Sequence, residues 1–117
     1  MTSGPDSKPP LLERRPKAPK RVLLTGIVTY AGGSYTLDCT IRDLSETGAR
    51  IGVRMHAQLP SDFYLINIRD RVAYDSKVVW RGASNIGVTF RNLYPLYEVI
   101  DPPLSYLKRL WLAKATR

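Results

Sequence analysis

Alternation of apolar and polar residues, with a period of two, runs through most of residues 22–92 and is typical of β-strands with one buried face. The clearest run covers residues 34–42, where the apolar positions are Tyr35, Leu37, Cys39 and Ile41. Five further runs of strand length begin near positions 22, 49, 63, 72 and 86. Short turns join them, and Gly32-Gly33 predicts a two-residue hairpin turn between the first two runs. These runs predict an all-β fold, either a small antiparallel barrel or a sandwich.

The two ends of the chain differ from this middle part. Residues 1–20 contain five prolines and many charges, which predicts a disordered tail over 1–12 and a flexible arm over 13–21. Near the other end, Asp101 precedes two prolines, and leucine and tryptophan residues then follow helical spacing. We expect a helix over about 102–114, with Asp101 near its N-cap. Residues 13–117 are expected to form a single domain whose barrel covers 22–92.

The net charge of +8 is concentrated at the two ends of the chain. Residues 1–21 hold six basic and two acidic residues, and residues 108–117 hold four basic and no acidic ones. The part between them balances eight basic against eight acidic residues. Such basic ends suit a polyanion or a compact anionic ligand, and equally a charged surface that keeps the protein in solution.

Few residues are available for catalysis. The chain has one histidine, His56, and one cysteine, Cys39, and its carboxylates are scattered, so no metal-ligand cluster or catalytic pair stands out. No phosphate-binding loop or nucleophile motif occurs. We therefore expect a binding protein without enzymatic activity, cofactor or metal. The lone cysteine, with no hydrophobic N-terminal segment and no apolar run of membrane-spanning length, favours a cytoplasmic location without a membrane partner.

The six-residue connection Asp43–Gly48, DLSETG, lies between two predicted strands and has the pattern D-x-S-x-x-G. Turn chemistry explains this pattern in one interpretation, because Asp and Ser accept hydrogen bonds from nearby backbone N–H groups and Gly adopts positive φ. A ligand site explains it in the other. A basic arm precedes the first strand, and in a small barrel the start of strand one and this connection can share a rim. The basic residues of the arm are Arg14, Arg15, Lys17, Lys20 and Arg21.

An arm and a connection of this composition favour an anionic nucleotide as ligand. Guanidinium groups bind phosphate and stack on planar rings, and an Asp carboxylate accepts hydrogen bonds from the N–H edge of guanine. The sequence here resembles the PilZ domain family over roughly residues 13–91. DLSETG matches that family's [D/N]-x-S-x-x-G motif, and VVWRGASNIGVTF is similar to its closing strands. The resemblance implies a six-stranded antiparallel barrel with a C-terminal helix.

The same resemblance implies a function in bacterial signalling. The flexible arm would fold over the second messenger cyclic di-GMP, and the change would reach an effector protein that the sequence does not identify. The implied ligand-binding residues are Arg14, Arg15, Lys17, Lys20, Arg21, Asp43, Ser45 and Gly48. Two other functions stay open, namely a PilZ-type adaptor that binds no ligand and a small basic barrel that binds nucleic acid. Nucleic acid is the less favoured partner.

In one respect the arm departs from the family, which carries R-x-x-x-R. Lys17 falls on the first of these arginines and Arg21 on the second, with Arg14 or Arg15 as the alternative for the first. Around the motif, Arg42 and Arg50 are weaker candidates for ligand contacts. Further along the chain, Trp80 and Phe90 are expected in the core.

Overall fold

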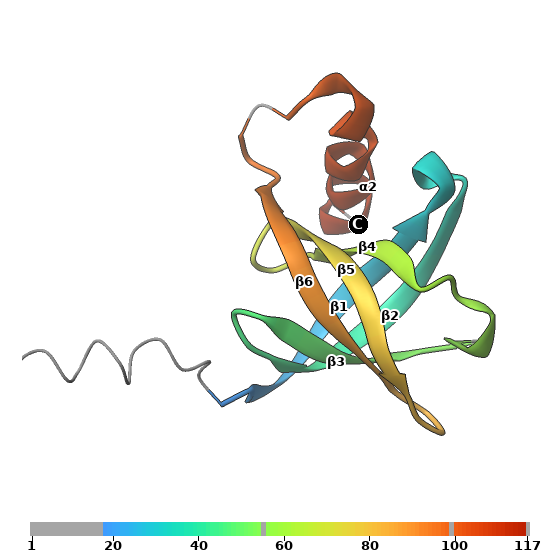
Figure 1. Ribbon diagram of the computed structural model, residues 1–117. Coiled ribbons are helices and arrows are strands. Elements are labelled where there is room, and N and C mark those ends of the chain that lie inside the picture. The colour runs from blue at the N-terminus through green and yellow to red at the C-terminus, as the bar shows by residue number, and fades with distance from the viewer. Residues whose placement is uncertain (1–17, 55, 99, 117) are drawn as a thin grey trace, which may run out of the picture.

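Six antiparallel strands in the computed structural model form one sheet that closes on itself in the order β1-β2-β3-β6-β5-β4 (Figure 1). The structure describes residues 18–54, 56–98 and 100–116. The all-β barrel with a C-terminal helix that the sequence predicts is confirmed. The strands are β1 (Lys20–Tyr30), β2 (Tyr35–Leu44), β3 (Gly48–Val53), β4 (Asp62–Asn67), β5 (Val72–Arg81) and β6 (Ile86–Pro95).

The barrel interior is filled by the apolar positions of the alternating runs. Fully buried side chains come from five strands: Val28, Ile41, Ile51, Leu65 and Ile86. Tyr74 and Phe90 stack with their ring centroids 3.9 Å apart, and Phe90 packs against this core as expected. Each strand therefore keeps one face for the core and leaves the other for the outside of the barrel.

Two connections differ from the sequence prediction. Tyr30 pairs with Tyr35, so the first hairpin has a four-residue loop, Ala31–Ser34, and not a two-residue turn. Ala31 has a φ of 54° and therefore leaves the strand before the two glycines. The second connection is shorter than predicted: only Ser45–Thr47 lie between β2 and β3, because β2 continues through Leu44 and pairs with β3.

A β-bulge at Arg42 decides which way the end of β2 faces. Ile41 pairs with Ile51, but Asp43 pairs with Arg50, so β2 carries one extra residue between these pairs. Without it, Asp43 would share the inward face of Ile41, because side chains alternate between the two faces. The extra residue reverses the alternation and turns Asp43 to the outside of the barrel.

A second bulge turns Trp80 outward in the same way. Val78 pairs with Val88 and Trp80 with Gly87, so Val79 is the extra residue of β5. Trp80 is 46% exposed, and the prediction that it belongs to the core is wrong. Simple alternation from Val78 would have placed the indole inside, and the bulge reverses that assignment.

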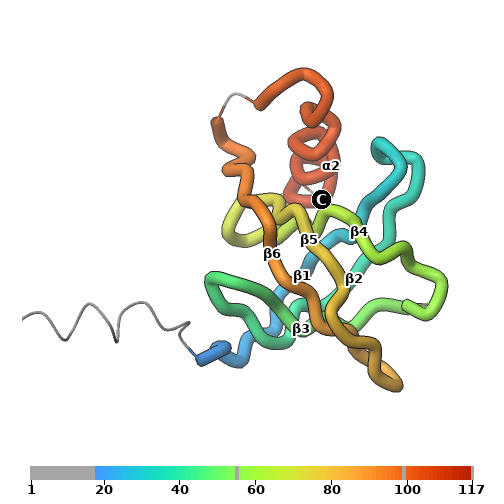
Figure 2. The backbone as a smooth tube through the Cα atoms, viewed as in Figure 1, coloured from blue at the N-terminus to red at the C-terminus, as the bar shows by residue number. Residues whose placement is uncertain are grey.

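The C-terminal helix covers the outer face of the barrel near β1 and β4. A 3-10 turn, η3 (Pro102–Leu104), leads into α2 (Ser105–Ala115), and Asp101 makes no side-chain capping bond. Leu107 is fully buried in a second apolar cluster with Ile27, Ile66, Ala73 and Leu96. Figure 2 shows this helix at the end of the barrel opposite to the start of β1.

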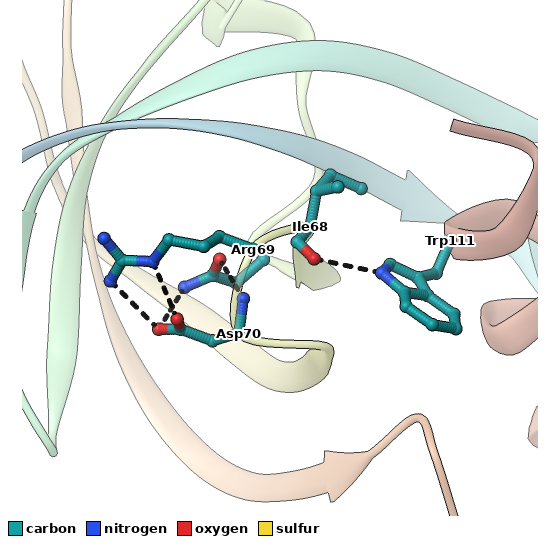
Figure 3. Close-up of polar contacts among 5 residues, drawn as sticks. Ile68, Arg69, Asp70 and Trp111 are labelled. Carbon is teal, nitrogen blue, oxygen red and sulfur yellow. Dashed lines mark hydrogen bonds and ion pairs between the residues drawn. The ribbon is translucent and has the colours of Figure 1, made fainter. Parts of the chain in front are cut away.

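A hydrogen bond fixes α2 to the turn between β4 and β5. The indole N–H of Trp111 donates to the carbonyl oxygen of Ile68 at 3.0 Å (Figure 3). The same turn is held by Asn67, whose side chain donates to the Asp70 carboxylate and accepts from the Asp70 backbone N–H. The helix and this turn thus form one end of the molecule. None of the helices in the described ranges is long and apolar enough to span a membrane.

Candidate functional site

Three strands place charged residues in a row on the outer face of the barrel. Asp43 on β2 pairs with Arg21 on β1 and with Arg50 on β3. The Arg50 guanidinium donates a hydrogen bond to the Asp43 carboxylate and forms an ion pair with it. Arg21 is exposed and makes no ion pair with any described residue. The row therefore offers a positioned carboxylate and, beside it, a guanidinium free to bind an anion.

The hydroxyl of Ser45 organises the connection between β2 and β3. Its oxygen accepts hydrogen bonds from the backbone N–H groups of Thr47 and Gly48, each at 3.2 Å. The Ser45 backbone N–H in turn donates to the Gly48 carbonyl oxygen at 2.9 Å. The Ser45 hydroxyl thus satisfies two backbone N–H groups of the turn, as is typical of serine in turns.

Gly48 is required where the connection meets β6. A Cβ atom at this position would lie 2.3 Å from the carbonyl oxygen of Val88. The preceding carbonyl, that of Thr47, accepts from the Phe90 backbone N–H at 2.9 Å and from the Thr89 hydroxyl at 3.2 Å. The connection is thereby held against β6, and only a residue without a side chain fits so close to a neighbouring backbone.

These residues line a cleft of about 360 Å³, here called the motif cleft. It contains Asp43, Ser45 and Gly48 from the motif and Arg50 from β3. Its other lining residues are Pro19, Thr47, Ala49, Trp80, Val88 and Thr89. The volume lies within the range usual for small-ligand sites. Because Pro19 directly precedes β1, the chain enters the barrel along the wall of this cleft.

Trp80 supplies the aromatic surface of the motif cleft. A Cβ atom on Gly87 would lie 2.0 Å from the indole Nε1, so the ring lies over the glycine on the neighbouring strand. Trp80 was predicted to lie in the core and not in a site, so its role in the cleft is a new finding. A sequence signal that could have identified it is Gly87, a glycine that pairs with Trp80 and leaves room for its ring.

The residues predicted for ligand binding are distributed as follows. Asp43, Ser45 and Gly48 meet in one cleft, and Arg21 lies opposite Asp43. Lys20 lies on the other side of the connection, in a more apolar cleft of about 360 Å³ that also contains Ser45. The predictions for Arg14, Arg15 and Lys17, and for the tail over 1–12, concern residues outside the described ranges.

No His, Cys, Asp or Glu cluster of three or more that could hold a metal ion is found among the residues that the structure describes. Cys39 is buried inside the barrel, and burial, with a smaller contribution from Asp38, raises the pKa of its thiol to about 12. A thiol with a raised pKa is a poor nucleophile. The residues of the motif cleft offer hydrogen bonds, charge and an aromatic ring for stacking.

The fold and the site therefore define a class of protein. It is a small closed β-barrel with a candidate binding cleft on its outer face, beside the start of β1. The family model of the PilZ domain matches residues 13–96, more than half of the chain. The chain belongs to the PilZ domain family. No curated protein shows a significant match to it.

Proposed function

We propose that this chain is a cyclic di-GMP receptor module of the cytoplasm that changes the conformation of its arm on ligand binding and signals to an effector protein. The family is known for cyclic di-GMP binding. The observation that carries the proposal is the motif cleft, where Asp43, Ser45 and Gly48 lie at the point where the arm enters the barrel. The family's domains act as binding and adaptor modules rather than as enzymes.

The groups in and beside the motif cleft match the parts of a guanine dinucleotide. The Asp43 carboxylate, positioned by Arg50, accepts hydrogen bonds from the N–H edge of a guanine. The Arg21 guanidinium, together with basic residues of the arm, binds the phosphates. The exposed indole of Trp80 provides a face on which a base stacks. Closing of the arm over the ligand excludes water from these contacts and strengthens them.

A calorimetric titration with cyclic di-GMP, set against GTP and a short DNA duplex, tests this proposal. We expect a dissociation constant in the micromolar range or below, equivalent to roughly −8 kcal/mol or better. GTP and DNA should bind at least tenfold more weakly. No detectable heat with cyclic di-GMP at hundreds of micromolar would favour the adaptor that binds no ligand, and tighter binding of DNA would favour the basic barrel.

Two variants locate the site. Arg21→Ala should weaken cyclic di-GMP binding by about 1.5–3 kcal/mol, the value of a hydrogen bond to a charged group. Ser45→Ala should cost about 1 kcal/mol in binding, as expected for a neutral hydrogen bond. Arg109→Ala is the matched control, because Arg109 is an exposed arginine on α2. If both site variants fold and bind like the parent protein, the site lies elsewhere.

A further inference from the structure

A second and larger cleft lies on the same barrel, beyond Gly52 and away from the motif cleft. Its volume is about 600 Å³, and it shares no lining residue with the motif cleft. We call it the arginine cleft. It is lined by Asp38, Cys39, Thr40, Arg42, Gly52, Val53, Arg54, His56, Ala83 and Ser84. One wall is therefore formed by β2, β3 and the residue that follows β3, and the other by η2 (His56–Gln58) and the β5–β6 turn.

The second wall of the arginine cleft is cross-linked by hydrogen bonds. The Nε2–H of His56 donates to the Ala83 carbonyl oxygen at 3.1 Å. The Arg81 guanidinium donates to the carbonyl oxygens of His56 and Leu59, the latter at 2.8 Å. These bonds tie η2 to the β5–β6 turn. The position of this wall is thus fixed by the protein's own hydrogen bonds.

The charge of the arginine cleft is positive. Arg42 and Arg54 are both exposed, and neither forms an ion pair with a described residue. Gly52 makes room for Arg42, because a Cβ atom there would lie 3.1 Å from the guanidinium Nε. The single carboxylate in the lining, that of Asp38, is already paired with Lys114 of α2 at 2.9 Å. Two guanidinium groups are therefore available for anionic partners.

Two hydrogen-bond acceptors beside these arginines lack a donor. His56 Nδ1 and Asn85 Oδ1 are buried and have no partner among the described residues. With Nε2–H donating to Ala83, the Nδ1 of a neutral imidazole is an acceptor. Asn85 Oδ1 lies beside Arg42 above Gly52, since a Cβ there would be 3.2 Å from it. Buried acceptors without partners are rare in native proteins. Of the two residues, His56 lines the cleft, so its Nδ1 is an acceptor that a ligand N–H group can satisfy.

We propose that the arginine cleft binds an acidic peptide segment of a partner protein. An extended peptide carries carboxylates for Arg42 and Arg54, and backbone N–H groups for the unpartnered Nδ1 of His56 in the cleft wall. Single-stranded nucleic acid is a poorer match, because no aromatic residue lines the cleft to stack a base. The proposal rests on the adaptor part of the proposed function and names the chemistry of its partner.

Fluorescence anisotropy with a fluorescein-labelled acidic peptide, six alternating glutamate and glycine residues, tests the proposal on the full chain. The same peptide with glutamine in place of glutamate and a labelled single-stranded DNA hexamer are run beside it. Of these three probes, we expect only the acidic peptide to bind measurably at low salt. Arg54→Glu should weaken it at least about tenfold, as expected for losing a charge-assisted hydrogen bond. Arg109→Glu, the same charge reversal on α2, should leave it unchanged.

Four outcomes would overturn the proposal: no binding of the acidic peptide to the parent chain at millimolar concentration, equal loss in both charge-reversal variants, tighter binding of the DNA, or displacement of the peptide by inorganic phosphate at equal concentration. Circular dichroism establishes that each variant is folded. A cyclic di-GMP titration of Arg54→Glu keeps the two functions apart, because Arg54 does not line the motif cleft. Loss of peptide binding in Arg54→Glu, with a cyclic di-GMP affinity equal to that of the parent, supports the proposal. A parent that binds the peptide but no cyclic di-GMP would contradict the receptor function and leave the peptide site standing.

Discussion

Gly48, Ser45 and Asp43 are kept in place by different physical causes, although they form one sequence motif. Packing against the Val88 carbonyl oxygen accounts for Gly48, and the turn accounts for Ser45. Neither the turn nor the core requires Asp43, whose carboxylate is hydrogen-bonded and ion-paired, among the described residues, with Arg50 alone. Turn chemistry thus explains Ser45 alone, because Gly48 does not adopt the positive φ that the turn interpretation expected. Packing explains Gly48, and the ligand interpretation is needed mainly for Asp43.

Gly48→Ala and Gly87→Ala should have different effects, because their added Cβ atoms meet different neighbours. At Gly48 the neighbour is a backbone oxygen, so we expect a loss of about 1–3 kcal/mol in the free energy of unfolding, typical of overpacking. At Gly87 the neighbour is the Trp80 ring, which can rotate away. Gly87→Ala should therefore cost less stability but change the tryptophan emission.

Urea unfolding measures the first effect, and fluorescence in a Trp111→Phe background, which leaves Trp80 as the remaining tryptophan, measures the second. Equal losses of stability in the two variants would show that the indole is as fixed as the backbone. Unchanged emission in Gly87→Ala would place the Trp80 ring elsewhere.

Lys17 is the residue at which the arm departs from the family pattern. A lysine offers a point charge where an arginine offers a planar pair of donors, so Lys17→Arg should tighten cyclic di-GMP binding by about 1 kcal/mol. Lys17→Ala should weaken it, and less so at high salt if the contact is exposed. Titration of both variants at two salt concentrations measures this. If neither Lys17 variant changes the affinity while Arg14→Ala or Arg15→Ala lowers it, one of those arginines occupies the first arginine position of the family pattern.

At the scale of the elements, period two predicted the strands well and failed where a bulge intervenes. The inward face of β2 follows the alternation from Leu37 to Ile41, and the sequence shows it directly. The bulges at Arg42 and Val79 depend on pairing with other strands, which a local pattern does not contain. This is why the fold was predictable while the outward position of Trp80 was not.

Leu107 is the fully buried residue of the C-terminal helix, and a matched pair of variants tests its contribution. Leu107→Ala should lower the free energy of unfolding by about 2–5 kcal/mol, because Leu107 has no exposed surface and its loss leaves a cavity. Leu112→Ala, on the same helix at 43% exposure, should cost much less. Urea unfolding of both proteins measures the difference. Equal effects would mean that α2 does not pack through Leu107.

Across the whole molecule, stability should fall at alkaline pH. Burial raises the pKa of the Cys39 thiol to about 12, so the folded state keeps a proton that the unfolded state loses above about pH 9. Burial also raises the pKa of Tyr74, which acts in the same direction above about pH 10. Because the folded state then binds more protons, the free energy of unfolding decreases by up to about 1.4 kcal/mol per pH unit for each group.

Urea unfolding at pH 8, 9 and 10 measures this loss, and Cys39→Ala isolates the contribution of the thiol. The variant should show a smaller decrease between pH 9 and 10 than the parent protein. Identical slopes in the two proteins would mean that the thiol is not protected from ionisation by the fold.

The candidate site was predictable in part. The motif and the pairing of Arg21 with the end of β2 follow from the order of the strands, and the sequence placed them on one rim. The grouping of Arg42 with Arg54 and His56 could not be predicted, because it depends on how η2 and the β5–β6 turn pack together. Contacts between loops that are distant in sequence leave no periodic signal.

Because the sheet is closed, the structure of the barrel depends on all six strands at once. β1 pairs with β4 and β3 pairs with β6, so each of the six described strands is bonded on both sides and none of them is an open edge. A cut or deletion in any one strand would open the ring and remove both clefts together. During evolution, the connections can therefore change one at a time, whereas all six strands must be retained together.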